Sequence, residues 1–284
     1  MGELKVFMLI GDPVEGSLSP AMMNAAFRAL KLNYIYVAVR VPQKLLESAI
    51  TGARKIGIAG LNVTIPHKIA VMKFLDGLDE SASLAGAVNT IKNSRGKLLG
   101  FNTDGEGALR NLEERIGRVR GRKVLLLGAG GAARAIAFSL LCAGAELTIA
   151  NRTLARAEEL AALIEKKLGK KLKIISMDPN KLKKAIADAE VLINATSVGM
   201  RPKVNETLVT ADMMHRNLIV YDIVYKPLRT RLLREAGKAG AMTIDGLGML
   251  VRQGALALEI WTGRRAPIKV MEAAARREIG DVIG

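Results

Sequence analysis

The fold class of this chain is decided by one stretch, Lys123-Val-Leu-Leu-Leu-Gly-Ala-Gly-Gly-Ala-Ala-Arg134. Its apolar run predicts a buried strand, and the glycines after it predict a tight turn directly into a helix. Gly128 permits the turn, Gly130 lets a pyrophosphate approach the backbone, and Ala133 lets the helix pack closely on the strand. The phosphates would then lie on the free N–H groups at the helix N-terminus. Alone, such a glycine loop is weak evidence, because glycines also mark ordinary turns.

The sequence about twenty residues further on strengthens this interpretation. A second predicted strand, 147–151, ends where NAD-binding proteins carry an Asp or Glu for the ribose hydroxyls. This chain has Asn151-Arg152-Thr153 there, followed by Arg156. A carboxylate would repel a 2′-phosphate, whereas a guanidinium pairs with it through forked hydrogen bonds. Both arginines could instead be solvated residues in the first turn of a helix, but their spacing from the glycine loop favours NADP as the cofactor.

Length and composition fit two globular domains with a large core. The chain has 284 residues, of which 50% are hydrophobic and only 4% aromatic. The formal net charge is +16, and basic runs at 118–123 and 166–173 raise the question of nucleic-acid or membrane binding. The positive charge is spread along the chain, however, without a basic tail or an aromatic-rich basic stripe. We therefore expect no nucleic-acid and no membrane partner, but a basic surface that favours the approach of an anionic small-molecule substrate.

The single cysteine, Cys142, excludes an intrachain disulfide and a cysteine zinc site, and we expect no metal. Cys142 ends an apolar stretch, 135–142, and is predicted to be a small core residue. The first ten residues hold an apolar run too short for a secretion signal, and no stretch is long enough to cross a bilayer. The sequence therefore predicts a soluble, cytoplasmic protein.

Short apolar runs alternate with helix-length segments from residue 123 to residue 246. Predicted strands cover 123–128, 147–151, 173–176, 191–195, 218–223 and 242–244, a pattern typical of a Rossmann-type doubly wound parallel sheet. The first hundred residues show a shorter α/β rhythm. Strands are predicted at 5–11, 34–41 and 61–65, and helices at 20–31, with Ser19 as the cap, and at 43–56.

Four polar segments interrupt the first half of the chain where apolar residues would otherwise be expected. They are Ser-Leu-Ser-Pro at 17–20, Asn-Val-Thr-Ile-Pro-His-Lys at 62–68, Ala-Val-Asn-Thr at 87–90 and Asn-Thr-Asp-Gly at 102–105. Each begins or ends at a predicted strand terminus, where α/β proteins place ligands. Hydroxyls, amides, one amine and one carboxylate together suit a small polyhydroxylated molecule.

At these residues the chain resembles the shikimate dehydrogenase family, and the resemblance covers nearly its whole length. Nine motifs carry it in family order: Ser17-Leu-Ser-Pro20, Asn62-Val-Thr-Ile-Pro-His-Lys68, Gly86-Ala-Val-Asn-Thr90, Asn102-Thr-Asp-Gly105, Gly128-Ala-Gly-Gly-Ala-Ala-Arg134, Asn151-Arg-Thr153, Asn194-Ala-Thr-Ser-Val-Gly-Met200, Asp222-Ile-Val-Tyr-Lys-Pro-Leu-Arg-Thr230 and Asp245-Gly-Leu-Gly-Met-Leu-Val-Arg-Gln253. The resemblance implies NADPH-dependent reversible reduction of 3-dehydroshikimate to shikimate, a step toward the aromatic amino acids.

The resemblance also implies roles for individual residues. Lys68 and Asp104 would form the catalytic acid–base pair. The residues implied to bind substrate are Ser17, Ser19, Asn62, Thr64, Asn89, Thr103, Tyr225 and Gln253. Those implied to bind NADP are Gly128, Ala129, Gly130, Gly131, Ala132, Asn151, Arg152, Thr153, Arg156, Thr196, Ser197, Met200, Gly246 and Met249.

Elementary chemistry supports the catalytic pair independently. Hydride delivery to a ketone creates an alkoxide, which a lysine ammonium can protonate, and Asp104 would fix the direction of that ammonium. Against this, most lysines only contact solvent, and an Asp before a Gly is common at turns and helix caps. His67 adjoins Lys68, but we interpret it as structural because adjacent side chains diverge, and His215 likewise.

The expected architecture is therefore α/β with two domains. Residues 1–107 and 247–284 would form an N-terminal α/β substrate domain, to which the C-terminal helices return, and 108–246 a Rossmann-type NADP domain, with a cleft between the two. Trp261, on the apolar face of the segment after 247, is interpreted as a packing residue. Alternatives are a quinate/shikimate dehydrogenase of broader cofactor use and a ligand-binding regulator without turnover. A homodimer is left open.

Overall fold

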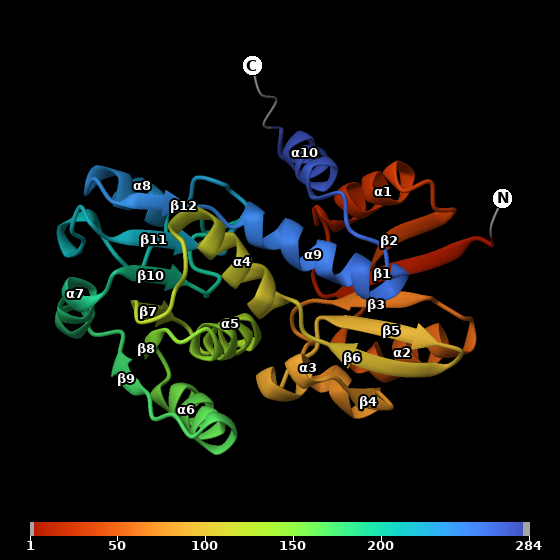
Figure 1. Cartoon of the computed structure of the whole chain (residues 1–284), viewed down its shortest axis with the longest axis horizontal. Helices are drawn as coiled ribbons and strands as arrows, with labels where there is room; N and C mark the ends of the chain where they lie inside the picture. The colour runs from red at the N-terminus through yellow and green to blue at the C-terminus, as the bar shows by residue number, and fades with distance from the viewer. Residues whose placement is uncertain (1–2, 281–284) are drawn as a thin grey trace. The chain divides into compact units, whose positions relative to one another are not determined.

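The computed structural model describes residues 3–280, which divide into two compact α/β units (Figure 1). Unit 1 holds the described residues up to Gly107 and those from Val251 onward, so the C-terminal helices return to it as predicted. Unit 2 is the continuous stretch Ala108–Leu250. The sequence predicts the second boundary at 246/247. The division falls four residues later, inside helix α9 (Leu247–Thr262), which runs through the boundary without a break.

Unit 2 contains the predicted Rossmann-type sheet. Its strands are β7 (Lys123–Leu127), β8 (Glu146–Asn151), β9 (Lys173–Ser176), β10 (Val191–Asn194), β11 (Ile219–Asp222) and β12 (Met242–Ile244). They pair in the order β12-β11-β10-β7-β8-β9, and every pair is parallel. All six predicted strands are confirmed, with each end within one residue of its predicted position.

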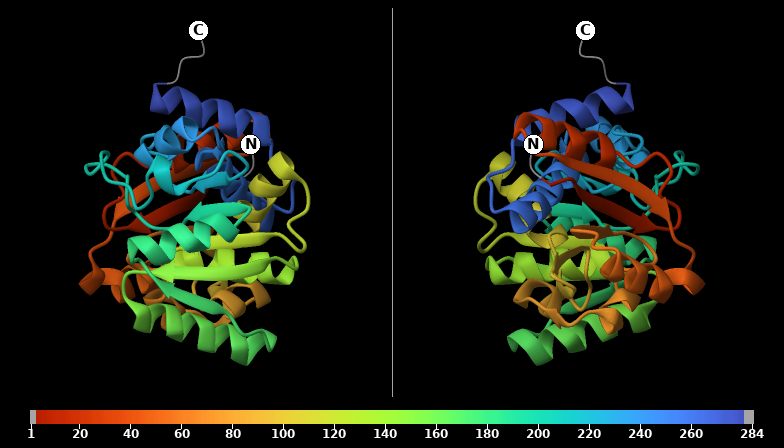
Figure 2. Two further views of the ribbon diagram at one scale, coloured as in Figure 1. Left: turned by 90° about the vertical axis from the view of Figure 1, so that its left-hand side faces the viewer. Right: turned by 90° about the vertical axis from the view of Figure 1, so that its right-hand side faces the viewer.

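Helices cover both faces of this sheet. Leu125 and Leu127 of β7 share a core cluster with residues of α7 (Pro179–Asp188) and α8 (Arg231–Lys238). The helices α5 (Gly131–Cys142) and α6 (Leu154–Leu168) lie on the other side of the sheet from α7 (Figures 1 and 2). Strands buried on both faces are continuously apolar rather than alternating, which explains why these were easy to predict.

Cys142 is exposed, so its prediction as a core residue is wrong. It is the last residue of α5, whose buried side includes Phe138 and Leu141. Because α5 is apolar almost all round, the sequence does not mark which face is covered.

The sheet of unit 1 is mixed. Its strands are β1 (Lys5–Gly11), β2 (Tyr34–Arg40), β3 (Gly60–Val63), β4 (Gly77–Leu78), β5 (Thr90–Ser94) and β6 (Lys97–Phe101), in the order β2-β1-β3-β5-β6-β4. The first three confirm predicted strands, whereas β4, β5 and β6 were not predicted. Strand β5 is antiparallel to both β3 and β6, so its amino end lies at the same edge as the carboxyl ends of its neighbours.

Two helical layers enclose this sheet as well. Ile10, Leu61 and Ile91 pack in a cluster that includes residues of α2 (Leu46–Lys55). On the other face, the Phe7 ring lies 5.3 Å from that of Phe27 in α1 (Ser19–Ala29) and 4.7 Å from that of Trp261 in α9. Trp261 is thus a packing residue, as predicted. Helix α10 (Ile268–Ile279) lies beside α1 (Figure 1).

Two helix starts in unit 1 differ from prediction. Ser19 is the first residue of α1 rather than its cap, and its backbone N–H donates to Ser17 Oγ at 3.2 Å. The predicted helix 43–56 begins as a 3₁₀ turn, Gln43–Leu45, before α2. The remaining helices are α3 (Glu80–Ala85) and α4 (Asp104–Ile116), which begins in unit 1 and continues into unit 2. Across residues 3–280, no helix is long and apolar enough to span a membrane.

Candidate active site

The polar segments of unit 1 meet at one edge of its sheet. The loops that follow β1, β3 and β6 leave from the carboxyl ends of these strands, and the residues before antiparallel β5 arrive at the same edge. The predicted residues at this edge are Ser17, Ser19, Thr64, Lys68, Asn89, Thr103 and Asp104. The topology therefore brings together side chains from four separate segments of the sequence.

Lys68 and Asp104 form an ion pair within unit 1. The Lys68 Nζ donates to Asp104 Oδ2 at 2.5 Å, and the two side chains are 17% and 6% exposed. Asp104 is the first residue of α4, where the helix dipole favours a carboxylate. The Lys68 backbone is also fixed, because Val88 N donates to Lys68 O at 2.7 Å. The pair is thus a nearly buried carboxylate that holds a partly accessible ammonium.

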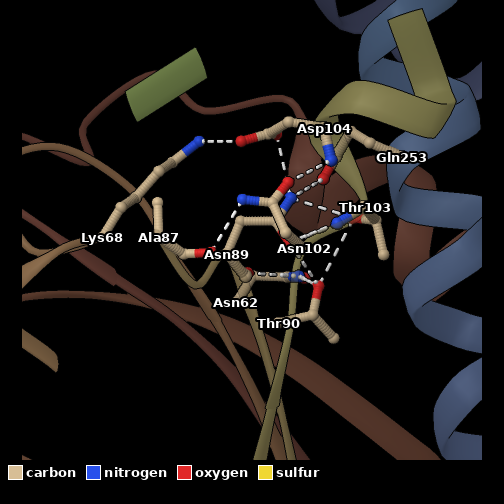
Figure 3. Close-up of polar contacts among 9 residues, drawn as sticks. All are labelled: Asn62, Lys68, Ala87, Asn89, Thr90, Asn102, Thr103, Asp104 and Gln253. Carbon is tan, nitrogen blue, oxygen red and sulfur yellow. Dashed lines mark hydrogen bonds and ion pairs between the residues drawn. The ribbon is translucent and has the colours of Figure 1, made fainter. Parts of the chain in front are cut away.

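Asn89 lies at the centre of the hydrogen bonds around this pair (Figure 3). Its Nδ2 donates to Asp104 Oδ1 and to Thr103 Oγ1, both at 2.9 Å. The same Nδ2 lies 3.4 Å from Gln253 Oε1, and Asn89 Oδ1 accepts from Thr103 N at 2.8 Å. The two Asp104 oxygens therefore have different partners, the amide of Asn89 and the ammonium of Lys68.

Asn62 supports Asn89 through hydrogen bonds to the backbone of Asn89 and to the side chain of Thr90. The Asn62 Nδ2 donates to Asn89 O at 3.1 Å and to Thr90 Oγ1 at 3.0 Å, while its Oδ1 accepts from the Tyr36 hydroxyl at 2.8 Å. Asn62 is only 6% exposed. These bonds occupy its amide, which favours a supporting role over the direct substrate contact that the resemblance implied.

Two supporting residues were not assigned from the sequence. Asn102 Oδ1 accepts from Asp104 N at 3.0 Å, and its Nδ2 donates to Ala87 O at 2.9 Å. An Asn two residues before an Asp at a helix start is a recognisable capping signal. Tyr36, by contrast, lies in the middle of a strand, and nothing in the local sequence distinguishes it from a core aromatic.

The serine and threonine loops share this edge. Asp12 N donates to Ile65 O at 2.9 Å, which joins the loop after β1 to the loop after β3. Glycine at position 11 leaves room for Thr64, since a Cβ there would lie 2.2 Å from Thr64 Cγ2. Ser19 is buried, whereas Ser17 and Thr64 are half-buried.

His67 is structural, as interpreted from the sequence. It is fully buried, and its Nε2 lies 2.6 Å from Val41 O. His215 similarly places Nε2 3.1 Å from Ala189 O. Among residues 3–280, no group of three His, Cys, Asp or Glu side chains is arranged to hold a metal ion.

The glycine loop of unit 2 lies between β7 and α5. Gly128 has φ +112°, a conformation that favours glycine. Gly130, the residue before α5, has φ −80°, is exposed, and a Cβ there would touch nothing within 4 Å. Among residues 3–280, therefore, no contact requires glycine at position 130, and the backbone there is open. The neighbouring Ala129 is buried, and Gly131 and Ala132 begin α5.

The predicted 2′-phosphate residues follow β8. Asn151 ends this strand and its Nδ2 donates to Thr153 O at 2.8 Å. Arg152 and Arg156 are exposed at the start of α6, and within residues 3–280 neither guanidinium has a hydrogen-bond or ion-pair partner. Two positively charged side chains at the N-terminus of a helix interact unfavourably with the helix dipole. A bound anion would offset this unfavourable interaction. The local chemistry thus fits an anionic group.

The other predicted cofactor residues follow β10, β11 and β12. After β10, Thr196 is half-buried, Ser197 is exposed and Met200 is 37% exposed. Tyr225, after β11, is half-buried, and desolvation raises the pKa of its phenol. Gly246 precedes α9 and is packed so closely that a Cβ would lie 2.2 Å from Ile223 O. Met249 is buried. All belong to unit 2, at the edge that carries the glycine loop.

Comparison with known families matches three consecutive parts of the chain. Residues 9–91 match the shikimate dehydrogenase substrate binding domain, residues 110–230 match the shikimate / quinate 5-dehydrogenase family, and residues 246–276 match the shikimate 5′-dehydrogenase C-terminal domain.

Individual relatives match over nearly the full length. The shikimate dehydrogenase (NADP(+)) of Methanopyrus kandleri is 58% identical over 275 residues, 96% of this chain and 95% of the relative. A crystal structure of a shikimate dehydrogenase in complex with NADP⁺ has a TM-score of 0.93 at 49% identity, covering 97% of this chain and 96% of that one. The Listeria monocytogenes shikimate 5-dehydrogenase in complex with shikimate and NAD has a TM-score of 0.89 at 41% identity, covering 96% of each chain.

Proposed function

The chain belongs to the shikimate dehydrogenase family, and on that premise we propose that it catalyses the NADP-dependent interconversion of 3-dehydroshikimate and shikimate. The observation that carries the proposal is the ion pair of Lys68 and Asp104, with the second carboxylate oxygen held by Asn89. Such an arrangement supplies a proton at one defined point, which is what reduction of a ketone requires besides a hydride.

Bound NADPH would supply the hydride to the carbonyl carbon. The Lys68 ammonium gives a proton to the carbonyl oxygen as negative charge develops on it, and in the reverse direction the neutral amine takes that proton back. Asp104 Oδ2 directs the Nζ, and the hydrogen bond from Asn89 to Oδ1 restrains the carboxylate from rotating. General acid catalysis of this kind contributes about 10²–10⁴-fold in rate.

Unit 1 would bind the substrate. Its carboxylate and hydroxyls require several hydroxyl and amide partners, and the proposed contacts are Ser17, Ser19, Thr64, Asn89, Thr103 and Gln253, to which the family resemblance adds Tyr225. The clustering of hydroxyl and amide groups at the same sheet edge as Lys68 supports this assignment. Asn62 contributes indirectly, by holding Asn89 in place.

Unit 2 would bind NADP. The pyrophosphate would lie against Gly128, Ala129, Gly130, Gly131 and Ala132, at the N-terminus of α5. Asn151, Arg152, Thr153 and Arg156 would take the 2′-phosphate. The nicotinamide half would contact Thr196, Ser197, Met200, Gly246 and Met249. The unpartnered guanidiniums and the open backbone at Gly130 support these assignments.

The test is a comparison of initial rates of nicotinamide reduction, with shikimate or quinate as substrate and NADP or NAD as cofactor. We expect fast turnover only with shikimate and NADP. Comparable rates with quinate or NAD would indicate a quinate/shikimate dehydrogenase of broader use, a candidate favoured by the NAD bound to the Listeria relative. No turnover in any combination, from folded protein, would contradict the proposal and favour a ligand-binding regulator.

A further inference from the structure

A second buried polar cluster lies in unit 2, at the carboxyl edge of its sheet. Asn194, Asp222 and Thr230 are 2%, 0% and 0% exposed. Asp222 Oδ1 accepts from Asn194 Nδ2 at 2.9 Å and from Val224 N at 3.0 Å, and its Oδ2 accepts from Thr230 Oγ1 at 2.6 Å. All three donors are neutral, and burial raises the pKa of Asp222 to about 6. The hydrogen bonds described among residues 3–280 give this buried carboxylate neutral donors only, and burying a charge without an opposite charge lowers stability, so its presence needs an explanation.

On one side, the carboxylate fastens the loop after β10. Asn194, the last residue of that strand, donates to Asp222 and accepts through Oδ1 from Thr196 N at 3.1 Å and from Thr196 Oγ1 at 2.7 Å. Val198 N in turn donates to Thr196 Oγ1 at 3.1 Å. The loop 195–200 is therefore connected to Asp222 through one asparagine.

On the other side, the carboxylate closes the loop after β11. Val224, near the start of this loop, and Thr230, at its end, bond to opposite oxygens of the Asp222 carboxylate. Thr230 is also the cap of α8, since its Oγ1 accepts from Leu233 N at 3.3 Å. The loop 223–230, which carries Tyr225, thus begins and ends on one side chain.

Both loops lie against the other proposed cofactor elements. A Cβ at Gly128 would lie 3.1 Å from Ala195 O and 3.1 Å from Thr196 Cγ2, so the loop after β10 lies on the glycine loop. A Cβ at Gly246 would lie 2.2 Å from Ile223 O, so the loop after β11 lies on the start of α9. A displacement of either loop would therefore move the surface that faces the cofactor.

We infer that Asp222 is a positioning residue for the nicotinamide half of the cofactor, because its carboxylate fixes the loops 195–200 and 223–230 relative to each other. The inference rests on the proposed function, since it takes NADP as the ligand of this edge. Asp222 acts through Asn194, Thr196, Val224 and Thr230 and itself lies beneath the surface.

The geometry distinguishes two substitutions at this position. In Asp222→Asn, the amide oxygen can accept from Asn194 Nδ2 and Val224 N, and the amide nitrogen can donate to Thr230 Oγ1, so all three links remain. In Asp222→Ala, all three are lost and three buried donors are left without an acceptor. Asp222→Asn nearly preserves the shape of the side chain, whereas Asp222→Ala does not, and only Asp222→Asn keeps the two loops joined.

The experiment measures dissociation constants by calorimetry for NADP⁺ and for adenosine 2′,5′-bisphosphate, which lacks the nicotinamide half. We expect Asp222→Ala to weaken NADP⁺ by about tenfold or more, since several hydrogen bonds that position the loops are lost. Binding of the bisphosphate should change less than about twofold, and Asp222→Asn should stay within about threefold of the wild type for both ligands. The matched control is Glu235→Ala in α8. This change also removes a carboxylate that accepts a backbone hydrogen bond, from Ala211 N at 3.2 Å. Both constants should be unchanged in it.

Several results would overturn the inference. Unchanged NADP⁺ binding in Asp222→Ala, or an equal loss of both ligands, would reduce Asp222 to a structural residue. If Asp222→Ala does not fold, Thr230→Val, which removes only the donor to Oδ2, replaces it. We then expect a smaller loss that is still confined to NADP⁺, and equal losses for both ligands would again contradict positioning. If the wild-type protein binds neither NADP⁺ nor the bisphosphate, the proposed NADP-dependent function itself fails, and that result is separable because it appears before any substitution.

Discussion

The two polar clusters of this molecule are built alike and differ in one donor. In unit 1, Asn89 holds one oxygen of Asp104, and in unit 2, Asn194 holds one oxygen of Asp222. The other oxygen of Asp104 meets the Lys68 ammonium, which is 17% exposed, whereas the other oxygen of Asp222 meets the hydroxyl of fully buried Thr230. A carboxylate held by an asparagine amide is therefore suited to proton transfer where its second oxygen meets a charged, accessible group. It is suited to fixing loops where that oxygen meets a neutral, buried group.

The largest effect should come from removing the charged partner in unit 1. Lys68→Ala should lower kcat by about 10²–10⁴-fold, because the general acid is lost, while KM for shikimate changes much less. Steady-state kinetics in both directions would measure this. Lys73→Ala, an exposed lysine five residues away, serves as the control and should leave kcat intact. An unchanged kcat in Lys68→Ala would remove the functional contrast between the clusters.

The next effect concerns the sealed carboxylate of unit 2. Because the pKa of Asp222 is about 6 in the folded protein against 3.8 as the ordinary value, the folded state binds this proton more tightly than the unfolded state. Raising the pH from 4 to 7 ionises the buried group and should lower the free energy of unfolding by about 2 kcal/mol. The uncharged Asp222→Asn variant should lack this contribution. Urea denaturation of both proteins at pH 4, 5.5 and 7 measures it, and a difference between them that is constant with pH would refute it.

A third prediction concerns Arg152 and Arg156, two exposed cations of unit 2 for which residues 3–280 supply no ion-pair partner. Arg152→Ala should weaken NADP binding about ten- to a hundredfold and leave NAD nearly unaffected, because a charge-assisted hydrogen bond to the 2′-phosphate is lost. Dissociation constants for both cofactors check this, with Arg118→Ala, an exposed arginine before β7, as the control. Equal losses for the two cofactors would show that Arg152 does not recognise the phosphate.

The smallest effect is expected at Asn102, which supports the polar cluster of unit 1 through the backbone of Asp104. Asn102→Ala removes the acceptor for Asp104 N at the start of α4 and should lower the free energy of unfolding by about 1 kcal/mol. The fall in kcat should be only severalfold, because Lys68 and Asn89 still hold the carboxylate. Denaturation and kinetics together check this. A loss of kcat as large as that of Lys68→Ala would mean that Asn102 belongs to the reacting group rather than to its support.

The sequence predicted unit 2 more completely than unit 1, for a physical reason. The strands of unit 2 are buried on both faces and so are continuously apolar. The hairpin of β5 and β6 escaped prediction because its strands carry polar residues such as Lys92 and Asn93, and its turn is Arg95-Gly96, both at positive φ, rather than an Asn-Gly pair. This hairpin sets where Asn89 lies, so the centre of the polar cluster could not be located from the sequence.

The motifs pointed to the two residues that we propose to react, but not to the residues that hold them. Lys68 and Asp104 stand inside recognisable segments, and their chemistry can be argued from residue type. Asp222 also opens a motif, yet the motif did not indicate a role for it. Its proposed function depends on hydrogen bonds to Asn194, which precedes it in the sequence, and to Thr230, which follows it. Residues that act through other residues become visible only when distances are known.

The discontinuity of unit 1 has a consequence for the protein during its synthesis. Helix α1 packs against α10, and about 240 residues separate the end of one at Ala29 from the start of the other at Ile268. At ribosomal rates of about 5–20 residues per second, the nascent α1 waits roughly 12 to 50 s for its partner. Unit 2, a single uninterrupted stretch, ends 18 residues before α10 begins and is therefore complete about 1 to 4 s earlier. The domain that emerges first is thus finished last, and its apolar face around Met22, which lies with Met271 of α10 next to Gly254, is the surface that a chaperone would have reason to cover in the meantime.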